Sequence, residues 1–145
     1  MSSSIDPAAL LEAVADAVVA CDEKGAIVVW NAAAEHLFGY TRDEALGRSL
    51  DLIIPERLRA RHWEGYEVTM RTGHTKYGHD TLRVPAIDKA GRSLSIAFTV
   101  AMLFKDDGKP STIVSVIRDE TQRFADERTL KKRIAELEAA AKGEE

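Results

Sequence analysis

The stretch VVACDEKGAIVVWN, residues 18–31, carries the clearest structural signal in this 145-residue chain. Two apolar runs flank the polar segment Asp22-Glu23-Lys24-Gly25, whose glycine suits the positive φ of a tight turn. This arrangement predicts a β-hairpin. Asn31 then predicts the N-cap of a short helix that Gly39 ends, and Thr41-Arg42-Asp43-Glu44 matches a capping box for the next one.

Helix signals lie on both sides of this region. Asp6-Pro7 predicts a short capped helix within residues 1–16. The longest helix of the domain body is expected from Pro55 to about Arg71, with Gly73 as its end. Helices are therefore expected before and after the hairpin.

Three more strands are expected at residues 80–87, 92–104 and 112–117. In the middle one, apolar residues occupy every second position, which predicts one buried face; they are Leu94, Ile96, Phe98 and Val100. The order of elements predicts an α+β fold: a five-stranded antiparallel sheet with helices packed on one face, followed by a C-terminal amphipathic helix. The side enclosed between sheet and helices could hold a small molecule.

Composition narrows the function classes. The chain is long enough for one compact domain and carries a formal net charge of −4, which argues against nucleic acid as its main partner. Charges interrupt every apolar stretch, so no membrane span is expected. Residues 1–5 lack the features of a signal peptide, which suggests a cytoplasmic location. Cys21 is the single cysteine and cannot form an internal disulfide.

Several segments, in the right order, together resemble the PAS family of sensory domains. They are residues 18–31, 33–40, 44–48 and the Arg118-Asp119-Glu120-Thr121 segment, which resembles the Asp-x-Thr ending that leads into an output helix. The resemblance implies a cap helix at 1–16, a PAS domain at 17–121 and a signalling helix at 122–145. It says little about the ligand, because one fold hosts many ligands or none.

Residues 55–62, PERLRARH, resemble the haem-binding helix of oxygen-sensing PAS domains in rhizobial sensor kinases. The resemblance implies haem b as the cofactor and His62 as the ligand of its iron, with Phe98 and Val100 over the opposite side of the haem. The residues themselves agree in one respect: an apolar stripe places His62 and Tyr66 on the helix face that should meet the sheet.

One position departs from that resemblance. The oxygen sensors carry an arginine on the third strand of the sheet, where this chain has Leu82 followed by Arg83. Strand alternation allows only one of the two side chains to point inward. With Leu82 inward, the pocket is apolar and favours carbon monoxide or nitric oxide over oxygen. Met102 is a further possible axial ligand if its end of the strand faces the pocket.

Other interpretations stay open. His62 could instead be a packed or hydrogen-bonded residue of a cofactor-free domain. His36, His74 and His79 are weaker ligand candidates, at a helix end and in a loop. A flavin adduct is not expected, because the reactive-cysteine segment of the flavin-binding branch is absent.

No nucleophile–base pair, phosphate loop or metal quartet is evident, so the chain is not expected to be an enzyme. The charged C-terminal segment carries an apolar seam at a four-three-four spacing, formed by Leu130, Ile134, Leu137 and Ala141. This seam predicts a homodimer or the docking of an effector protein; the alternative is a solvated tail. Whether the chain is complete stays open.

The sequence therefore predicts a cytoplasmic PAS sensor that binds haem through His62, senses a diatomic gas or redox state, and signals through its C-terminal helix. The alternative is a cofactor-free module for protein interaction or dimerisation, or a sensor of an apolar metabolite. These two hypotheses differ mainly in the role of one histidine.

Overall fold

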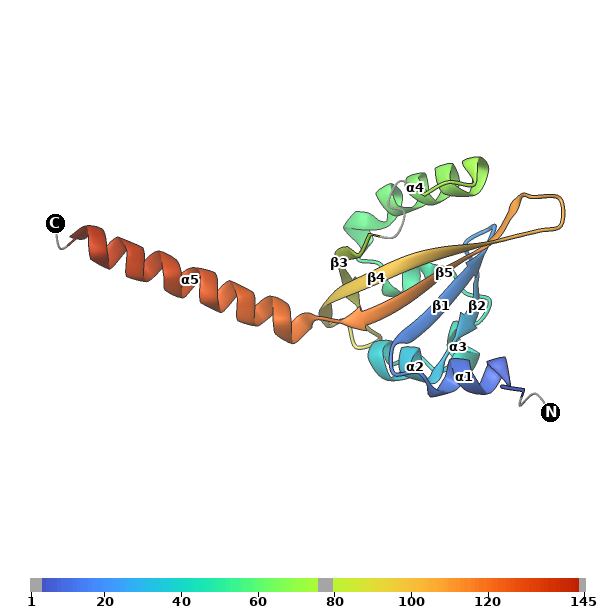
Figure 1. The fold of residues 1–145 in the computed structure, drawn as a ribbon, viewed down its shortest axis with the longest axis horizontal. Coiled ribbons are helices and arrows are strands. Elements are labelled where there is room, and N and C mark those ends of the chain that lie inside the picture. The colour runs from blue at the N-terminus through green and yellow to red at the C-terminus, as the bar shows by residue number, and fades with distance from the viewer. Residues whose placement is uncertain (1–3, 76–79, 144–145) are drawn as a thin grey trace.

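A computed structural model describes residues 4–75 and 80–143 of the chain, and its centre is a single antiparallel sheet (Figure 1). The strands are β1 (Ala17–Asp22), β2 (Ile27–Trp30), β3 (Leu82–Ile87), β4 (Ser93–Phe104) and β5 (Pro110–Asp119). Their order across the sheet is β2-β1-β5-β4-β3. The predicted five-stranded sheet is thus confirmed. Pro85 lies on the edge strand β3, where a missing backbone donor is tolerated.

The helices are α1 (Pro7–Ala13), α2 (Ala32–Phe38), α3 (Arg42–Ala45), α4 (Arg59–Thr72) and α5 (Thr121–Gly143), with 3₁₀ turns η1 (Leu50–Ile53) and η2 (Glu56–Leu58). The α-helix expected from Pro55 begins later, at Arg59. Its predicted first turn is the 3₁₀ turn η2, closed by a 2.9 Å bond from the backbone N–H of Leu58 to the Pro55 carbonyl.

The predicted helix caps are confirmed. The Asn31 side chain accepts the backbone N–H of Ala34, and Gly39 ends α2 in the left-handed region at φ 81°. Thr41 and Glu44 form the reciprocal bonds of a capping box at the start of α3. These local signals fix the two short helices directly after the hairpin.

The hydrophobic core is concentrated at one end of the inner face of the sheet, where α2, α3 and η1 pack. The buried core residues that we call the closed end are Ile27, Trp30, Ala34, Phe38, Ala45, Ile53, Ala86, Ile96 and Ile117. The Trp30 and Phe38 rings pack 5.5 Å apart between centroids. Most of the hydrophobic stabilisation of the domain is therefore located at this end.

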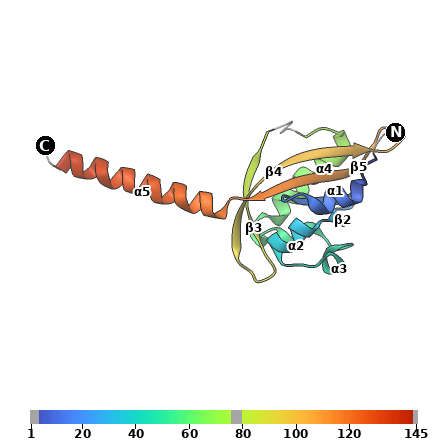
Figure 2. The ribbon, with the colours of Figure 1, turned by 60° about the horizontal axis from the view of Figure 1, so that its bottom comes forward.

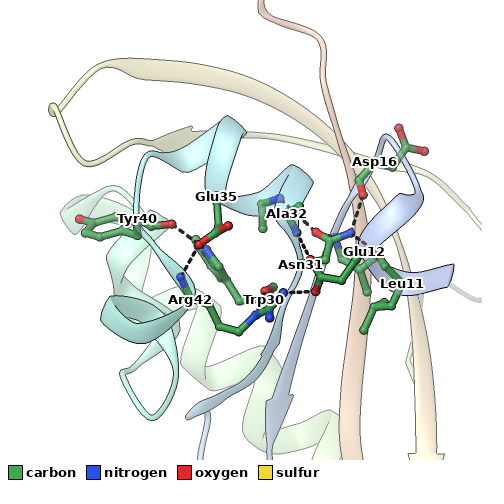
Figure 3. Close-up of polar contacts among 11 residues, drawn as sticks. Leu11, Glu12, Asp16, Trp30, Asn31, Ala32, Glu35, Tyr40 and Arg42 are labelled. Carbon is green, nitrogen blue, oxygen red and sulfur yellow. Dashed lines mark hydrogen bonds and ion pairs between the residues drawn. The ribbon is translucent and has the colours of Figure 1, made fainter. Parts of the chain in front are cut away.

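A buried asparagine fastens the N-terminal helix to the closed end (Figure 3). The Oδ1 atom of Asn31 accepts the backbone N–H groups of Val18 at 2.9 Å and Ala34 at 3.0 Å. Its Nδ2 atom donates to the carbonyls of Leu11 at 2.9 Å and Asp16 at 3.1 Å. The side chain is fully buried and makes all four bonds, so it ties α1, β1 and α2 together.

Charged side chains also hold α1 to the rest of the domain (Figure 3). Glu12 of α1 accepts the backbone N–H of Ala32 at 3.1 Å and pairs with the guanidinium of Arg42. Arg42 also donates from Nε to the Trp30 carbonyl at 3.0 Å. The α1 helix is thus held to the hairpin and to α3, although none of its own residues is buried.

The last strand passes directly into α5 through the Asp-x-Thr segment. Asp119 accepts the backbone N–H of Thr121 at 2.9 Å and its hydroxyl at 2.6 Å. The same Thr121 hydroxyl oxygen accepts the backbone N–H of Ser95 at 3.0 Å. This junction therefore anchors the first turn of α5 to β4.

Beyond that junction α5 stands clear of the domain body in both views (Figures 1 and 2). None of its residues is buried. Among the described residues, no helix has the length and apolar character to cross a bilayer.

Candidate functional site

Helix α4 crosses the inner face of the sheet and is fastened at both of its ends. At its start, Arg59 donates to the carbonyls of Ile54 at 3.0 Å and Asp51 at 3.2 Å. At its end, Gly73 lies against the β4–β5 hairpin, within about 4 Å of Phe104 and Pro110 for an added Cβ. The helix therefore forms a wall over the half of the sheet that the closed end leaves uncovered.

Two aromatic residues fix α4 to the β1–β2 turn. Trp63 donates from Nε1 to Oδ1 of Asp51 at 2.7 Å, and its ring lies directly on Gly25. A Cβ at Gly25 would come within 2.4 Å of two Trp63 ring carbons. The Tyr66 hydroxyl donates to the carbonyl of Asp22. Through these contacts Trp63 and Tyr66 anchor α4 to the turn.

His62 lies one turn before Tyr66 on the same stripe of α4. Leu58 and Tyr66, on either side of it, pack against the hydrophobic core, so the half-buried imidazole lies on the sheet-facing side of the helix. Its ring centroid is 4.5 Å from that of Trp63 and 5.9 Å from that of Tyr66. The predicted stripe is confirmed, although no residue of α4 is fully buried.

The hydrogen bonding of the His62 imidazole is incomplete. Its Nδ1 atom is the one side-chain nitrogen or oxygen in the described residues that is buried without a hydrogen-bond partner. Burial lowers the pKa of His62 from its usual 6.5, while the carboxylate of Asp51 acts in the opposite direction. The lowered pKa keeps the ring neutral at physiological pH, the form that can accept a proton or bind a metal.

The strands opposite α4 present an apolar surface that is only half-buried. Leu82 pairs with Phe98, Val100 with Ser115, and Met102 with Ile113, and cross-strand partners share a face. Phe98 contacts the core, so this face is the inner one. We call this apolar set, together with His62, the open end; its sheet members are Leu82, Phe98, Val100, Met102 and Ile113.

The register also decides between Leu82 and Arg83. Leu82 shares the inner face with Phe98, whereas Arg83 points to the outside and pairs with Glu120 at 3.2 Å between Nε and Oε2. Glu120 also pairs with Arg123 of α5 at 3.4 Å. Arg83 therefore does not line the open end, and its observed partners belong to the start of the C-terminal helix.

Two open surface grooves lie elsewhere. The larger, of about 510 Å³, runs between α1, α2 and the end of β5, where His36 is one of its lining residues. The other, of about 430 Å³, lies at the outer edge of α4, beside Tyr66 and Met70. Neither groove is lined by Leu82, Phe98 or Val100.

The remaining candidate ligands are not gathered into a site. His36 and His74 are exposed, and His79 lies outside the described residues. Within residues 4–75 and 80–143, no group of three or more His, Cys, Asp or Glu side chains is arranged to hold a metal ion. Cys21 is buried, and burial raises the pKa of its thiol to about 12, with a smaller contribution from Asp22.

Comparison with known proteins agrees with this fold. A family model described as the PAS fold matches residues 5–119. The chain belongs to the PAS family. The matched region includes α1 and the whole sheet, and it ends where α5 begins.

Relatives extend the comparison to sensor proteins. An uncharacterised protein of Azorhizobium caulinodans is 32% identical over 125 residues, which is 86% of this chain and 17% of that protein. The sensor protein FixL of Bradyrhizobium diazoefficiens is 38% identical over 53 residues, 37% of this chain and 10% of FixL. The oxygen sensor protein DosP of Escherichia coli is 41% identical over 46 residues, 32% of this chain and 6% of DosP. The PAS chain thus spans a small part of each relative.

Solved structures share the fold at low sequence identity. The PAS domain of a Colwellia psychrerythraea protein matches with a TM-score of 0.69 at 21% identity, over 79% of this chain and 94% of that one. An RNA-binding light-oxygen-voltage receptor matches with a TM-score of 0.68 at 18% identity, over 93% of this chain and 40% of that one. These likenesses support the PAS fold and carry no information about a ligand.

Sequence reasoning missed the residues that hold α4 in place. Asp51 was not singled out, although it accepts from Trp63 and affects the pKa of His62. Gly25 was expected only as a turn residue, yet its missing Cβ makes room for Trp63. No local pattern links residues so far apart in the chain; a glycine and a tryptophan carry that information only once the fold brings them together.

Proposed function

We propose that this PAS domain is a sensor that binds haem b at its open end, with His62 as the ligand of the haem iron. The observation that carries the proposal is the buried Nδ1 atom of His62, which has no hydrogen-bond partner among the described residues. A buried polar atom without a partner costs about 1–3 kcal/mol, so a ligand that engages this nitrogen would remove that cost.

The residues of the open end suit a flat apolar cofactor. His62 supplies a neutral imidazole, because burial lowers its pKa. Leu82, Phe98 and Val100 supply apolar contact and are only half-buried, so they retain surface that a ligand could cover. Haem, when bound, would supply an iron whose ligation or oxidation state responds to a diatomic gas or to redox conditions. Met102, on the same face, would offer a thioether as a further ligand for the iron.

The sensor relatives and the placement of Leu82 and Arg83 bear on which gas the proposed haem site would bind. The similarity to the oxygen sensor protein DosP and to the sensor protein FixL supports a sensory role for this segment. Leu82 faces inward and Arg83 outward, so β3 contributes no cationic donor to the open end. A haem bound at such an apolar site would favour carbon monoxide or nitric oxide over oxygen, whose binding benefits from a hydrogen-bond donor. The domain senses and transmits in this proposal and catalyses no reaction.

Haem reconstitution tests the proposal. Protein supplied with haem is expected to show a Soret band that His62→Ala abolishes and His36→Ala, at an exposed histidine of α2, preserves. Carbon monoxide should shift that band at lower concentration than oxygen does. Absence of a Soret band in the unmodified chain, or an unchanged band in His62→Ala, would refute binding through His62.

A cofactor-free interaction module is the second candidate. It is favoured by the contacts that already surround His62, since Trp63 and Tyr66 pack on its ring and hold α4 by their own hydrogen bonds. In that case the open end is filled by these side chains or by an apolar metabolite. The chain would then remain colourless after incubation with haem and still form dimers.

A further inference from the structure

The start of α5 is attached to the sheet through both β4 and β3. On β4, the carbonyl of Ser95 accepts the backbone N–H of Glu120 at 2.8 Å, and the N–H of Ser95 donates to the Thr121 hydroxyl at 3.0 Å. On β3, the guanidinium of Arg83 pairs with the carboxylate of Glu120 at 3.2 Å. The start of α5 lies beside β3 in both ribbon views (Figures 1 and 2). The helix is therefore joined to two neighbouring strands, by backbone bonds to one and by an ion pair to the other.

The carboxylate of Glu120 is the centre of a short chain of charges. It pairs with Arg83 at 3.2 Å and with Arg123 at 3.4 Å. Arg123 pairs in turn with Glu127, one turn further along α5, at 3.4 Å. The Glu120 side chain is only 16% exposed, whereas that of Arg83 is 60% exposed. Removing the partner of a largely buried charge costs more than breaking an exposed pair, so Glu120 depends on its arginines.

Strand β3 carries Arg83 on one face and a residue of the open end on the other. Leu82 shares the inner face with its cross-strand partner Phe98, and Arg83, the next residue, points to the outer face. Because both side chains are fixed to the same backbone, a displacement of β3 at its inner face also moves Arg83. Strand β3 lies at the edge of the sheet, next to β4, where a strand is less constrained than in the centre.

We propose that the Arg83–Glu120 ion pair couples the position of β3 to the orientation of α5, with Ser95 as the pivot of the helix. A helix held at Ser95 alone could change its direction freely, and the second attachment at Arg83 fixes that direction relative to β3. Arg83 and Glu120 are positioning residues on the outer face and act through α5. The proposal goes beyond haem binding and does not rest on it, because any change that displaces β3 acts through the same ion pair.

A second ion pair of the same kind provides a matched control. Arg92, an exposed arginine, pairs with the buried carboxylate of Asp88 at 2.8 Å between Nε and Oδ2. Asp88 and Arg92 flank the turn between β3 and β4, so their ion pair closes that turn and does not reach α5. Loss of this pair removes a similar contact without breaking the link between β3 and the helix.

Reciprocal effects on amide exchange in the haem-free full chain test the coupling. Arg83→Gln should speed exchange in residues 124–130 of α5 about two- to fivefold, and Glu120→Gln should speed exchange in β3 by a similar factor, since coupling acts equally in both directions. The double variant should change exchange no more than the single ones. Arg83→Lys, which keeps the charge, should retain most of the protection, and Arg92→Gln should leave residues 124–130 unchanged. Unchanged exchange in α5 of Arg83→Gln, or additive effects in the double variant, would overturn the coupling.

Transmission from the open end separates coupling from a merely structural contact. In the haem-free chain, Leu82→Ala reduces and Leu82→Trp increases the side-chain volume on the inner face of β3. At least one of them should change exchange in residues 124–130, and Arg83→Gln should abolish that response while the response of α4 persists. A response of α5 that survives Arg83→Gln, or no response to either substitution at Leu82, would overturn the proposal. Both experiments are done without haem, so a failure of haem binding leaves their outcomes unaffected.

Discussion

The two ends of the inner sheet face differ in how completely the chain fills them. At the closed end, Trp30 and Phe38 are buried to 1% and 0% exposure, and Asn31 satisfies every polar group it meets. At the open end, Phe98 is only half-buried, and His62 keeps a buried nitrogen without a partner. The chain's own side chains thus cover the inner face of the sheet fully at the closed end and only partly at the open end.

The two ends of the sheet therefore have different roles: the closed end contributes stability, and the open end is available for function. The closed end contains the large buried side chains, and burial of apolar surface is the main source of folding free energy. The open end is bounded by α4, which is held by a few contacts at the β1–β2 turn and at η1. A domain built this way can leave part of its inner face to a ligand without losing its fold.

Truncation of one phenylalanine at each end should show the largest contrast. Phe38→Ala is expected to lower the free energy of unfolding by about 3–5 kcal/mol, because it leaves a cavity in a fully buried site. Phe98→Ala, at a half-buried site, should cost less than about 2 kcal/mol. Urea unfolding of the haem-free chain measures both values. Equal losses at the two positions would contradict the distinction between the ends.

Removal of the buried amide should come next in size. Asn31→Ala leaves two backbone N–H groups and two carbonyls without their partner, and we expect a loss of about 3 kcal/mol in unfolding free energy. Thr41→Ala removes an exposed N-cap alone and should cost about 1 kcal/mol. If both variants lose the same amount by urea unfolding, the buried network contributes nothing beyond an ordinary cap.

A glycine pair isolates the contact that positions α4. Gly25 and Gly108 have nearly the same φ, 83° and 85°, but an added Cβ meets Trp63 only at Gly25. Gly108→Ala should cost about 1 kcal/mol from backbone strain, and Gly25→Ala about 2 kcal/mol because it also displaces the ring. In a Trp63→Ala background the two glycine substitutions should become equal in urea unfolding; a persistent difference would argue against this docking contact.

The smallest effect is expected at His62 itself. Without haem, His62→Leu should change the unfolding free energy by less than about 0.5 kcal/mol or increase it, because it removes a buried polar atom that has no partner. Replacing a buried histidine whose nitrogens are hydrogen-bonded would instead lower the unfolding free energy. A clear destabilisation in thermal unfolding would mean that the imidazole already has a structural role.

The pH dependence of the unfolding free energy, compared between the unmodified chain and His62→Leu, provides a further test of this residue. Since burial lowers the pKa of folded His62 below 6.5, the unfolded chain binds the proton more readily than the folded one. This contribution to stability is therefore present above about pH 6.5 and is lost as the pH falls from there through the folded pKa. His62→Leu should remove this part of the dependence, and identical pH profiles for the two proteins would show that His62 does not titrate as described.

Local sequence signals predicted well the short helices that pack at the closed end. The Asn31 cap, the Gly39 stop and the Thr41–Glu44 box each depend on residues a few positions apart, and all three are present. The sequence also predicted the number of strands and the sheet-facing stripe of α4. What it could not predict in Asn31 was the pair of bonds to Leu11 and Asp16, because these join segments that only the folded chain brings together.

The open end was harder to predict for the same reason. Both Leu82 and Arg83 fit an alternating strand, and only the pairing of Leu82 with Phe98 assigns the faces. The contact of Trp63 with Gly25 likewise depends on how α4 crosses the sheet. The resemblance of residues 55–62 to a haem-binding helix identified His62, but its unpartnered nitrogen became visible only in the structure.

Hydrogen exchange with and without haem tests most directly the claim that the open end is the ligand-binding end. We expect haem to slow amide exchange in α4 and in β3 around Leu82, while α2 and the strands of the closed end change little. His62→Ala should lose this protection and His36→Ala should retain it. Protection centred on α1 and α2, or no protection at all in the unmodified chain, would contradict the account.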